Sequence, residues 1–179
     1  MPHRLFAAIR PPDAVCDLLL DAMEGIEGAR WQDAENLHIT LRFVGEVDTP
    51  LANDLAAELA RIAAPPLRLS IAGVGHFEHK GRPHAIWARI APDAALDGLR
   101  KKVERPCVQA GLPPETRRFT PHITLARLNR SSGDIGAWLA RWGNLRTDPW
   151  DVQGFGLWES HLTPAGSHYE ERLRYRLAD

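Results

Sequence analysis

Apolar residues recur along the chain with two different periods, and segments of the two kinds alternate. Segments that are short and apolar, or that alternate apolar and polar residues, predict strands at residues 5–10, 38–44, 67–74, 84–90, 122–126, 152–160 and 169–177. Segments with apolar residues at helical spacing predict helices at residues 13–27, 49–63, 93–110 and 131–142. Glycine and proline fall at the joints between these segments, as expected for turns. The pattern therefore predicts a protein of interleaved strands and helices.

The order of the segments repeats within the chain. When the sequence is shifted by 80 residues, six of the twelve positions from 8 to 19 are identical, where chance gives about one. A shift of 84 residues aligns the tetrapeptide His-Ile-Thr-Leu at 38–41 with the same tetrapeptide at 122–125. These matches predict a duplicated strand–helix–strand unit. Because such connections within one sheet are right-handed, the two copies are expected to pair about a pseudo-twofold axis.

The repeated tetrapeptide carries the candidate chemistry. Residues i and i+2 of a strand point to the same face, so His38 lies beside Thr40 and His122 beside Thr124. A pseudo-twofold axis would bring both faces together across a groove. One imidazole could then accept a proton from a nucleophile while the other donates one to a leaving oxygen. With hydroxyls to hold phosphoryl oxygens, this arrangement predicts metal-free cleavage of a phosphodiester.

Two arginines are candidates for stabilising charge that develops on the phosphoryl group. Arg42 has the same parity as His38 and Thr40, so strict alternation places it in the same groove. Arg127 is at odd spacing from His122 and needs a bulge or a strand end to turn inward.

Other interpretations of these residues remain open. A lone histidine in a strand is more often a core residue, but two in duplicated context, each followed by threonine, favour catalysis. No zinc motif, P-loop or dinucleotide-binding motif is present, so we expect no metal and no cofactor. Phe77 either stacks on a base or packs in the core. The Arg117–Arg118 pair is either a phosphate-steering patch or an ordinary charged loop.

Composition narrows the class of protein. The 179 residues suit one domain, residues 1–179, built as two lobes. The 22 basic and 23 acidic residues give a net charge of −1, which excludes a histone-like polycation. Cys16 and Cys107 form no metal-binding spacing, which predicts buried free thiols. No apolar run approaches 18 residues, so neither a signal peptide nor a membrane span is expected, and the protein is expected to be cytoplasmic.

Taken together, these motifs resemble a known family. Two His-x-Thr motifs about eighty residues apart resemble the signature of the 2H phosphoesterases, and their context resembles the RNA 2′,3′-cyclic phosphodiesterase branch, also called 2′-5′ RNA ligases. The resembling stretches are residues 4–9, 35–45, 73–77, 119–127 and 157–169. The resemblance implies a bilobal α+β fold in which two antiparallel sheets face a central groove with helices outside.

The resemblance also implies an activity. It implies His38 and His122 as the catalytic pair, Thr40 and Thr124 as phosphate ligands, and no metal. The expected reaction opens a 2′,3′-cyclic phosphate at an RNA end to a 2′-phosphomonoester, and near symmetry suggests that the same pair can run the reverse ligation. The expected partner is RNA or a related nucleotide, bound by a monomer. The rivals are a phosphodiesterase for 2′-5′ oligonucleotides or small cyclic nucleotides, and a non-catalytic RNA-binding module. Glu78-His79 departs from the family pattern, which leaves the base contacts open.

Overall fold

The computed structural model describes residues 2–178 of the chain. Its strands are β1 (His3–Ile9), β2 (Arg30–Trp31), β3 (Ile39–Val47), β4 (Leu67–Leu69), β5 (Ile71–His79), β6 (Arg82–Ile90), β7 (His122–Arg127), β8 (Trp150–Val152), β9 (Gly154–Thr163) and β10 (Gly166–Arg176). Its helices are α1 (Asp13–Leu20), α2 (Thr49–Leu59), α3 (Ala94–Gln109) and α4 (Gly136–Trp142), with a 3-10 turn at Ala34–Asn36.

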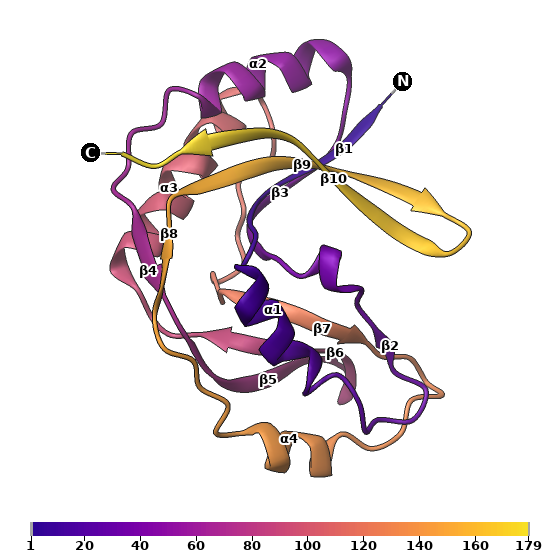
Figure 1. The fold of residues 1–179 in the computed structure, drawn as a ribbon. Coiled ribbons are helices and arrows are strands. Elements are labelled where there is room, and N and C mark those ends of the chain that lie inside the picture. Colours follow the sequence, from indigo (N-terminus) through magenta and orange to yellow (C-terminus); the bar gives the residue numbers. More distant parts are fainter. Residues whose placement is uncertain (1, 179) are drawn as a thin grey trace.

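The strands form two antiparallel halves that meet at one point. The main sheet has the order β10-β9-β1-β3-β7-β6-β5, with β2 added beside β7, and β4 pairs with β8 in a second, two-stranded sheet. The register between β3 and β7 contains the single pair Ile39 and Ile123. Figure 1 shows the consequence: β10, β9, β1 and β3 form the upper half of the molecule, and β7, β6 and β5 form the lower half. The two expected sheets are therefore two halves of one hydrogen-bonded path.

The duplication is visible in the structure, although one reason given for it does not hold. In the first copy β1 is followed by α1 and pairs with β3, and in the second copy β6 is followed by α3 and pairs with β7. Both pairings are antiparallel. The handedness rule concerns parallel strands, so it does not explain the pseudo-symmetry. The symmetry follows instead from repetition of the same element order and the same strand pairing.

The helices are exchanged between the halves. Helix α3 follows β6 of the lower half but packs against β3 and α2 of the upper half. Helix α1 follows β1 of the upper half and lies in front of β6 and β7 in Figure 1. The chain just after α1 is tied to the lower half, because the indole nitrogen of Trp138 in α4 donates a hydrogen bond to Ala22 O at 2.7 Å. Helix α3 of the second copy thus packs on the upper half, and the chain that follows α1 of the first copy is bound to the lower half.

Local sequence explains where the long helices begin. The Asp48 carboxylate accepts a hydrogen bond from Leu51 N at 3.0 Å, and Asp93 accepts one from Leu96 N at 2.8 Å, so each aspartate caps a helix N-terminus. Apolar side chains of both halves then form one continuous buried cluster. Cys16 and Cys107 are buried free thiols within it, as predicted.

Several element boundaries differ from the predicted ones. Helix α1 ends at Leu20 rather than near residue 27, because the chain continues in tight turns in which Ala22 N donates to Leu19 O and Met23 N to Leu20 O, and the positive φ values of Gly25 and Gly28 prevent the helix from resuming. Helix α4 begins at Gly136 rather than near residue 131. The expected strands at 67–74 and 152–160 are each split in two, as β4–β5 and β8–β9. Strand β5 is kinked at Gly73, which has a φ of +93° and lies at a register shift between Ile71 and Val74.

Candidate active site

The same hydrogen bond fixes the histidine of each His-x-Thr motif. His38 Nδ1 lies 2.6 Å from Asn36 O, and His122 Nδ1 lies 2.6 Å from Thr120 O. A carbonyl oxygen only accepts, so the proton of each neutral ring is on Nδ1 and Nε2 is left as an acceptor. In both copies, Nε2 is therefore the nitrogen available to exchange a proton with a bound molecule.

Aromatic rings enclose His38. Its ring centroid lies 4.9 Å from that of Phe6 and 5.3 Å from that of Tyr169, whose ring meets it edge-on. This burial lowers the pKa of His38 to about 4, against the opposing effect of the hydrogen bond to Asn36 O. The free protein therefore holds this imidazole neutral at physiological pH.

A second pair of aromatic rings packs around His122. The Phe77 ring meets it edge-on at 4.9 Å, and the Trp87 ring lies 5.4 Å away. Burial again lowers the pKa of the imidazole. Gly75 makes room for the indole, because a Cβ at that position would overlap the Trp87 ring. The two copies thus build similar surroundings from different side chains.

A β-bulge follows the threonine of each motif. On β3, Thr40 is opposite Ala8 but Arg42 is opposite Ala7, so Leu41 is an extra residue in the strand. On β7, Thr124 is opposite Trp87 but Ala126 is opposite Ile86, so Leu125 is extra in the same way. A bulge changes the side to which all later side chains point. The face of the residue two positions after each threonine therefore differs from the face that strict alternation predicts.

The bulges determine which face of the sheet each of the two candidate arginines lies on. Arg127 lines the groove with both histidines, so the bulge that its spacing required is present. The prediction that Arg42 faces this groove is wrong, because the bulge at Leu41 turns it to the opposite face. There its Nε lies 2.6 Å from Glu104 Oε2, and its Nη2 donates to Pro113 O at 2.5 Å. Arg42 is 9% exposed, holds the chain ahead of β7 and borders a second hollow described below rather than the groove of the two histidines.

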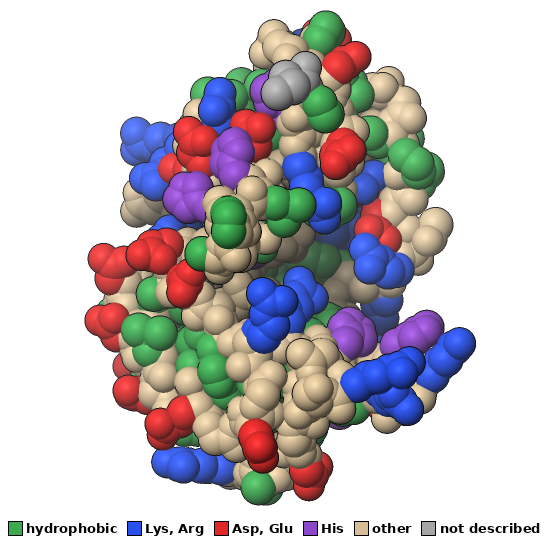
Figure 2. Space-filling view, turned by 90° about the vertical axis from the view of Figure 1, so that its right-hand side faces the viewer, with side chains coloured by type: hydrophobic (Ala, Val, Ile, Leu, Met, Phe, Trp, Pro, Cys, Tyr) green, Lys and Arg blue, Asp and Glu red, His purple; other side chains and the backbone are tan. Residues whose placement is uncertain are grey.

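The groove between the halves contains both motifs. It is a cavity of about 430 Å³ lined by His38, Thr40, His122, Thr124 and Arg127, all of which the sequence predicts. Arg42, which was also predicted to line it, does not. Further lining comes from residues that the sequence did not single out as functional, including Arg4, Phe6, Arg30, Asn36, Phe43 and Tyr169. Figure 2 shows a hollow at the centre of this face with Lys and Arg side chains around it, while acidic side chains gather to its left.

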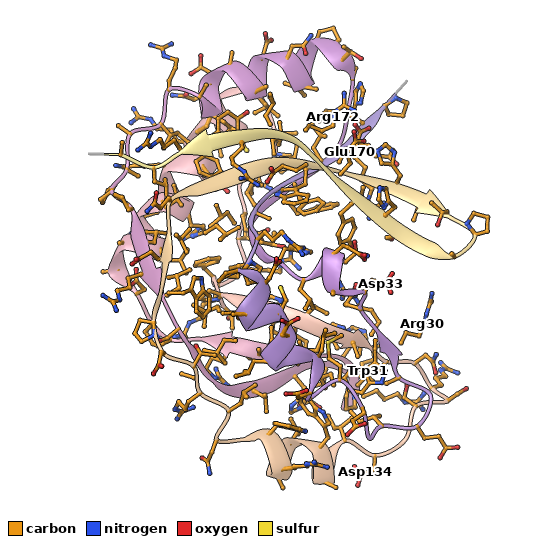
Figure 3. The ribbon with its side chains drawn as sticks, in the orientation of Figure 1. Arg30, Trp31, Asp33, Asp134, Glu170 and Arg172 are labelled. Carbon is orange, nitrogen blue, oxygen red and sulfur yellow. The ribbon has the colours of Figure 1, made fainter. Side chains whose placement is uncertain are left out.

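One wall of the groove is the segment that carries β2. Figure 3 shows Arg30 and Asp33 on the side below the β9–β10 hairpin, whereas Trp31 points back toward α4. The Trp31 and Trp138 ring centroids are 6.4 Å apart, which anchors the segment. No periodic pattern marks this short strand, so nothing in the sequence indicated it.

Asn36 and Thr120 were missed by reasoning from the sequence. Their main-chain carbonyls orient the two histidines, and each precedes its histidine by two residues. The Asn36 side chain also donates to Ser167 O at 3.0 Å, which joins this turn to the β9–β10 hairpin. The equal offset within the duplication was the available signal, but a carbonyl contact leaves no mark on residue type.

Phe77 borders a second hollow next to the groove. This cavity of about 420 Å³ shares Thr40, Phe43 and His122 with the groove of the two histidines and extends to Phe119 and the Arg117–Arg118 pair. Phe77 packs on His122 and Trp87 and also faces the hollow, so both interpretations of its role describe part of its surroundings.

The site contains groups for proton transfer and for anion binding. Within residues 2–178, no three His, Cys, Asp or Glu side chains converge in an arrangement that could hold a metal ion. Across the same residues, no helix is long and apolar enough to cross a membrane. Two neutral imidazoles, two hydroxyls and a guanidinium around one cavity can bind a phosphoryl group and exchange protons on either side of it.

Comparison with solved structures identifies the class of fold. The chain superposes on Escherichia coli LigT in complex with 3′-AMP with a TM-score of 0.81, at 24% identity and over 100% of each chain. It superposes on TT0787 of Thermus thermophilus with a TM-score of 0.79, at 26% identity and over 97% of each chain. The duplicated halves around a groove are therefore the fold of LigT-type phosphoesterases, as the resemblance implied.

Sequence comparison then gives the family. The chain belongs to the 2′-5′ RNA ligase superfamily, whose family model matches residues 11–163. It is 35% identical over 147 residues to an RNA 2′,3′-cyclic phosphodiesterase of Aeropyrum pernix, covering 80% of this chain and 84% of the relative. It is 28% identical over 171 residues to a protein of the same name from Archaeoglobus fulgidus, covering 94% of this chain and 97% of the relative.

Proposed function

We propose that the protein is an RNA 2′,3′-cyclic phosphodiesterase that hydrolyses the cyclic phosphate to a 2′-phosphomonoester. The observation that carries this proposal is the pair of imidazoles, each with Nδ1 bound to a main-chain carbonyl and each lining one groove beside a threonine. The names of the relatives from Aeropyrum pernix and Archaeoglobus fulgidus support it.

In the proposed reaction the cyclic phosphate lies between His38 and His122. Nε2 of the neutral histidine removes a proton from water as the water oxygen attacks phosphorus, and Nε2–H of the protonated histidine donates to the 3′-oxygen as its bond to phosphorus breaks. The Thr40 and Thr124 hydroxyls donate hydrogen bonds to the phosphoryl oxygens, and Arg127 stabilises their growing charge. The proton lost by water thus replaces the one given to the 3′-oxygen.

Product analysis tests this function. An RNA oligonucleotide ending in a 2′,3′-cyclic phosphate is incubated with the protein in excess chelator, and we expect quantitative conversion to the 2′-phosphate. Activity lost in chelator and restored by one divalent ion would overturn the metal-free reaction. Binding without turnover would support a non-catalytic module, and faster cleavage of 2′-5′ oligonucleotides or of 3′,5′-cyclic nucleotides would support the rival phosphodiesterases.

The same experiment also tests ligation. Because each copy supplies one imidazole, reversal of the two proton transfers would join a cyclic end to the 5′-hydroxyl of a second RNA through a 2′-5′ bond.

We further propose that the protein acts as a cytoplasmic monomer, which size-exclusion chromatography and cell fractionation would test.

A further inference from the structure

The hollow beside the catalytic groove has charged groups that the proposed reaction does not use. The guanidinium of Arg100 lies over the Phe119 ring at 5.1 Å from its centroid. Its Nε is buried and has no hydrogen-bond partner among residues 2–178. Arg118 is exposed and forms no ion pair within the part of the chain that the structure describes. Two cations therefore border one cavity without neutralising partners.

Of the two acidic residues that line the hollow, Glu78 and Glu115, only Glu115 is paired with an arginine. Glu115 accepts hydrogen bonds from Arg117 Nε at 3.1 Å and from Arg117 Nη2 at 3.2 Å, so this pair neutralises itself. Glu78 lies 3.6 Å from His76 at the rim. The charge left in the hollow is therefore that of the two unpaired guanidiniums, offset in part by Glu78.

The wall of the hollow is held in place from below. Glu104 binds Arg42 with one carboxylate oxygen, and its Oε1 accepts a hydrogen bond from Glu115 N at 3.0 Å. Arg42 also holds Pro113 O. The loop that carries Arg118 and Phe119 is thus fastened to α3 and β3 before any ligand arrives, which lowers the ordering cost of binding.

We propose that this hollow is the subsite for the nucleotide that precedes the cyclic end. This proposal rests on the proposed function. We assign Arg100 and Arg118 to the phosphate between the last two nucleotides, and the face of the Phe119 ring to the preceding base. Continuity with the catalytic groove through Thr40, Phe43 and His122 places this nucleotide beside the terminal one. Arg30 and Asp33, which have opposite charges, line the catalytic groove but not the hollow. Guanidinium and aromatic groups together are the usual surroundings of a single-stranded nucleic acid.

Comparison of one-nucleotide and two-nucleotide substrates tests the proposal. Adenosine 2′,3′-cyclic phosphate lacks the internal phosphate, and the dinucleotide with the same cyclic end contains it. We expect kcat/KM for the dinucleotide to exceed that for the mononucleotide by about 10-fold or more. Arg100→Met and Arg118→Met should each remove much of this advantage, and each should reduce the slope of log KM against log salt by about 1. Both variants should leave mononucleotide turnover within about twofold of the original.

The control is another arginine stacked on an aromatic ring. Arg141 lies over Trp142 at 5.2 Å on α4, outside both cavities, so Arg141→Met should leave both substrates unaffected. Equal losses for mononucleotide and dinucleotide in the Arg118→Met variant would overturn the proposal, because the hollow would then hold the terminal nucleotide. An unchanged ratio in both variants would overturn it as well.

Equilibrium binding separates this proposal from the proposed function. Adenosine 3′-phosphate and the dinucleotide bearing a 3′-phosphate are probes that need no turnover, so their affinities can be measured in an inactive protein. Tighter binding of the dinucleotide, lost in the Arg118→Met variant, would support the subsite even if no cyclic phosphate were hydrolysed. Equal affinities beside normal hydrolysis would overturn the subsite and leave the function intact.

Discussion

The two copies of the His-x-Thr motif are built alike up to the threonine and differently beyond it. Both imidazoles bind a carbonyl two residues earlier, and both strands contain a bulge one residue after the threonine. After the bulge, the first copy has Arg42 on the inner side and Phe43 on the groove side, whereas the second has Ala126 and Arg127. The shared part fixes the two imidazoles, and the divergent part places a buried, ion-paired arginine in the first copy and a groove-lining arginine in the second.

Removal of either imidazole is the most severe way to break the equivalence of the two copies. We expect His38→Ala and His122→Ala each to lower kcat/KM by about 10²–10⁴-fold, because one displacement needs both an acid and a base. The double variant should be little worse than the poorer single variant. Steady-state hydrolysis of a cyclic-phosphate RNA measures this, with circular dichroism as the check on folding. Near-full turnover together with early unfolding would make the histidines structural.

The pH profile of the same variants sharpens the comparison. One histidine must be protonated while the other is neutral, so kcat/KM should be bell-shaped. Because burial lowers the pKa of His38 to about 4 and that of His122 below 6.5, the optimum for the free enzyme should lie between about pH 4 and 6.5. Each single variant should lose one limb, which shows which ring is the base.

The second test concerns the copy that has Arg42. Arg42→Met leaves the Glu104 carboxylate buried without its partner, so we expect about 3–5 kcal/mol of lost unfolding free energy. Urea denaturation measures this loss, and the double variant Arg42→Met/Glu104→Leu should recover most of it. Arg61→Met is the control, since the Arg61–Glu58 pair is exposed and should contribute less than about 1 kcal/mol. If Arg42→Met had little effect on the free energy of unfolding, the first copy would not need an arginine for stability at the position where the second copy has Ala126.

The third test uses the pKa of His38, which burial lowers. Its folded pKa of about 4 lies below the usual 6.5, so the unfolded chain binds more protons between these pH values. Stability should therefore be full above about pH 6.5 and should fall by about 3 kcal/mol as the pH drops to 4. His38→Asn should flatten this part of the curve of unfolding free energy against pH. His79→Asn, at the exposed β5–β6 turn, is the matched control, and an equal flattening there would contradict the assignment.

The smallest expected effect comes from the hydroxyls that the two copies share. Thr40→Ala and Thr124→Ala should each cost about 1.5–3 kcal/mol of transition-state stabilisation, the range for a hydrogen bond to a charged group. Thr→Ser should recover most of it, as measured by kcat/KM. If Thr→Ser were as inactive as Thr→Ala, packing of the methyl group rather than the hydroxyl would explain the threonine.

Reasoning from the sequence was most successful where chemistry and repetition coincide. The strands that begin at the two His-x-Thr motifs are predictable because alternation and the repeated tetrapeptide both mark them. The face of Arg42 is not, because a bulge depends on pairing with β1 and leaves no local signal. The end of α1 is misplaced for a related reason, since apolar residues such as Met23 and Ile26 continue past the helix to pack on the core in a turn. Boundaries set by tertiary packing therefore escape prediction, whereas the convergence of the two repeated His-x-Thr motifs on one groove does not.

The exchanged helices have a consequence for how such a chain could have arisen. A gene encoding the second copy alone would have made a peptide whose helix α3 lacks the β3 and α2 surfaces on which it now packs, so covering that helix would have required a second chain. Its stability would then have depended on concentration. Fusion of two genes removes that dependence, and it also frees each copy to change separately. Arg42 and Ala126 at one pair of equivalent positions, and Phe43 and Arg127 at the next, are differences that two identical chains of a symmetric dimer could not have.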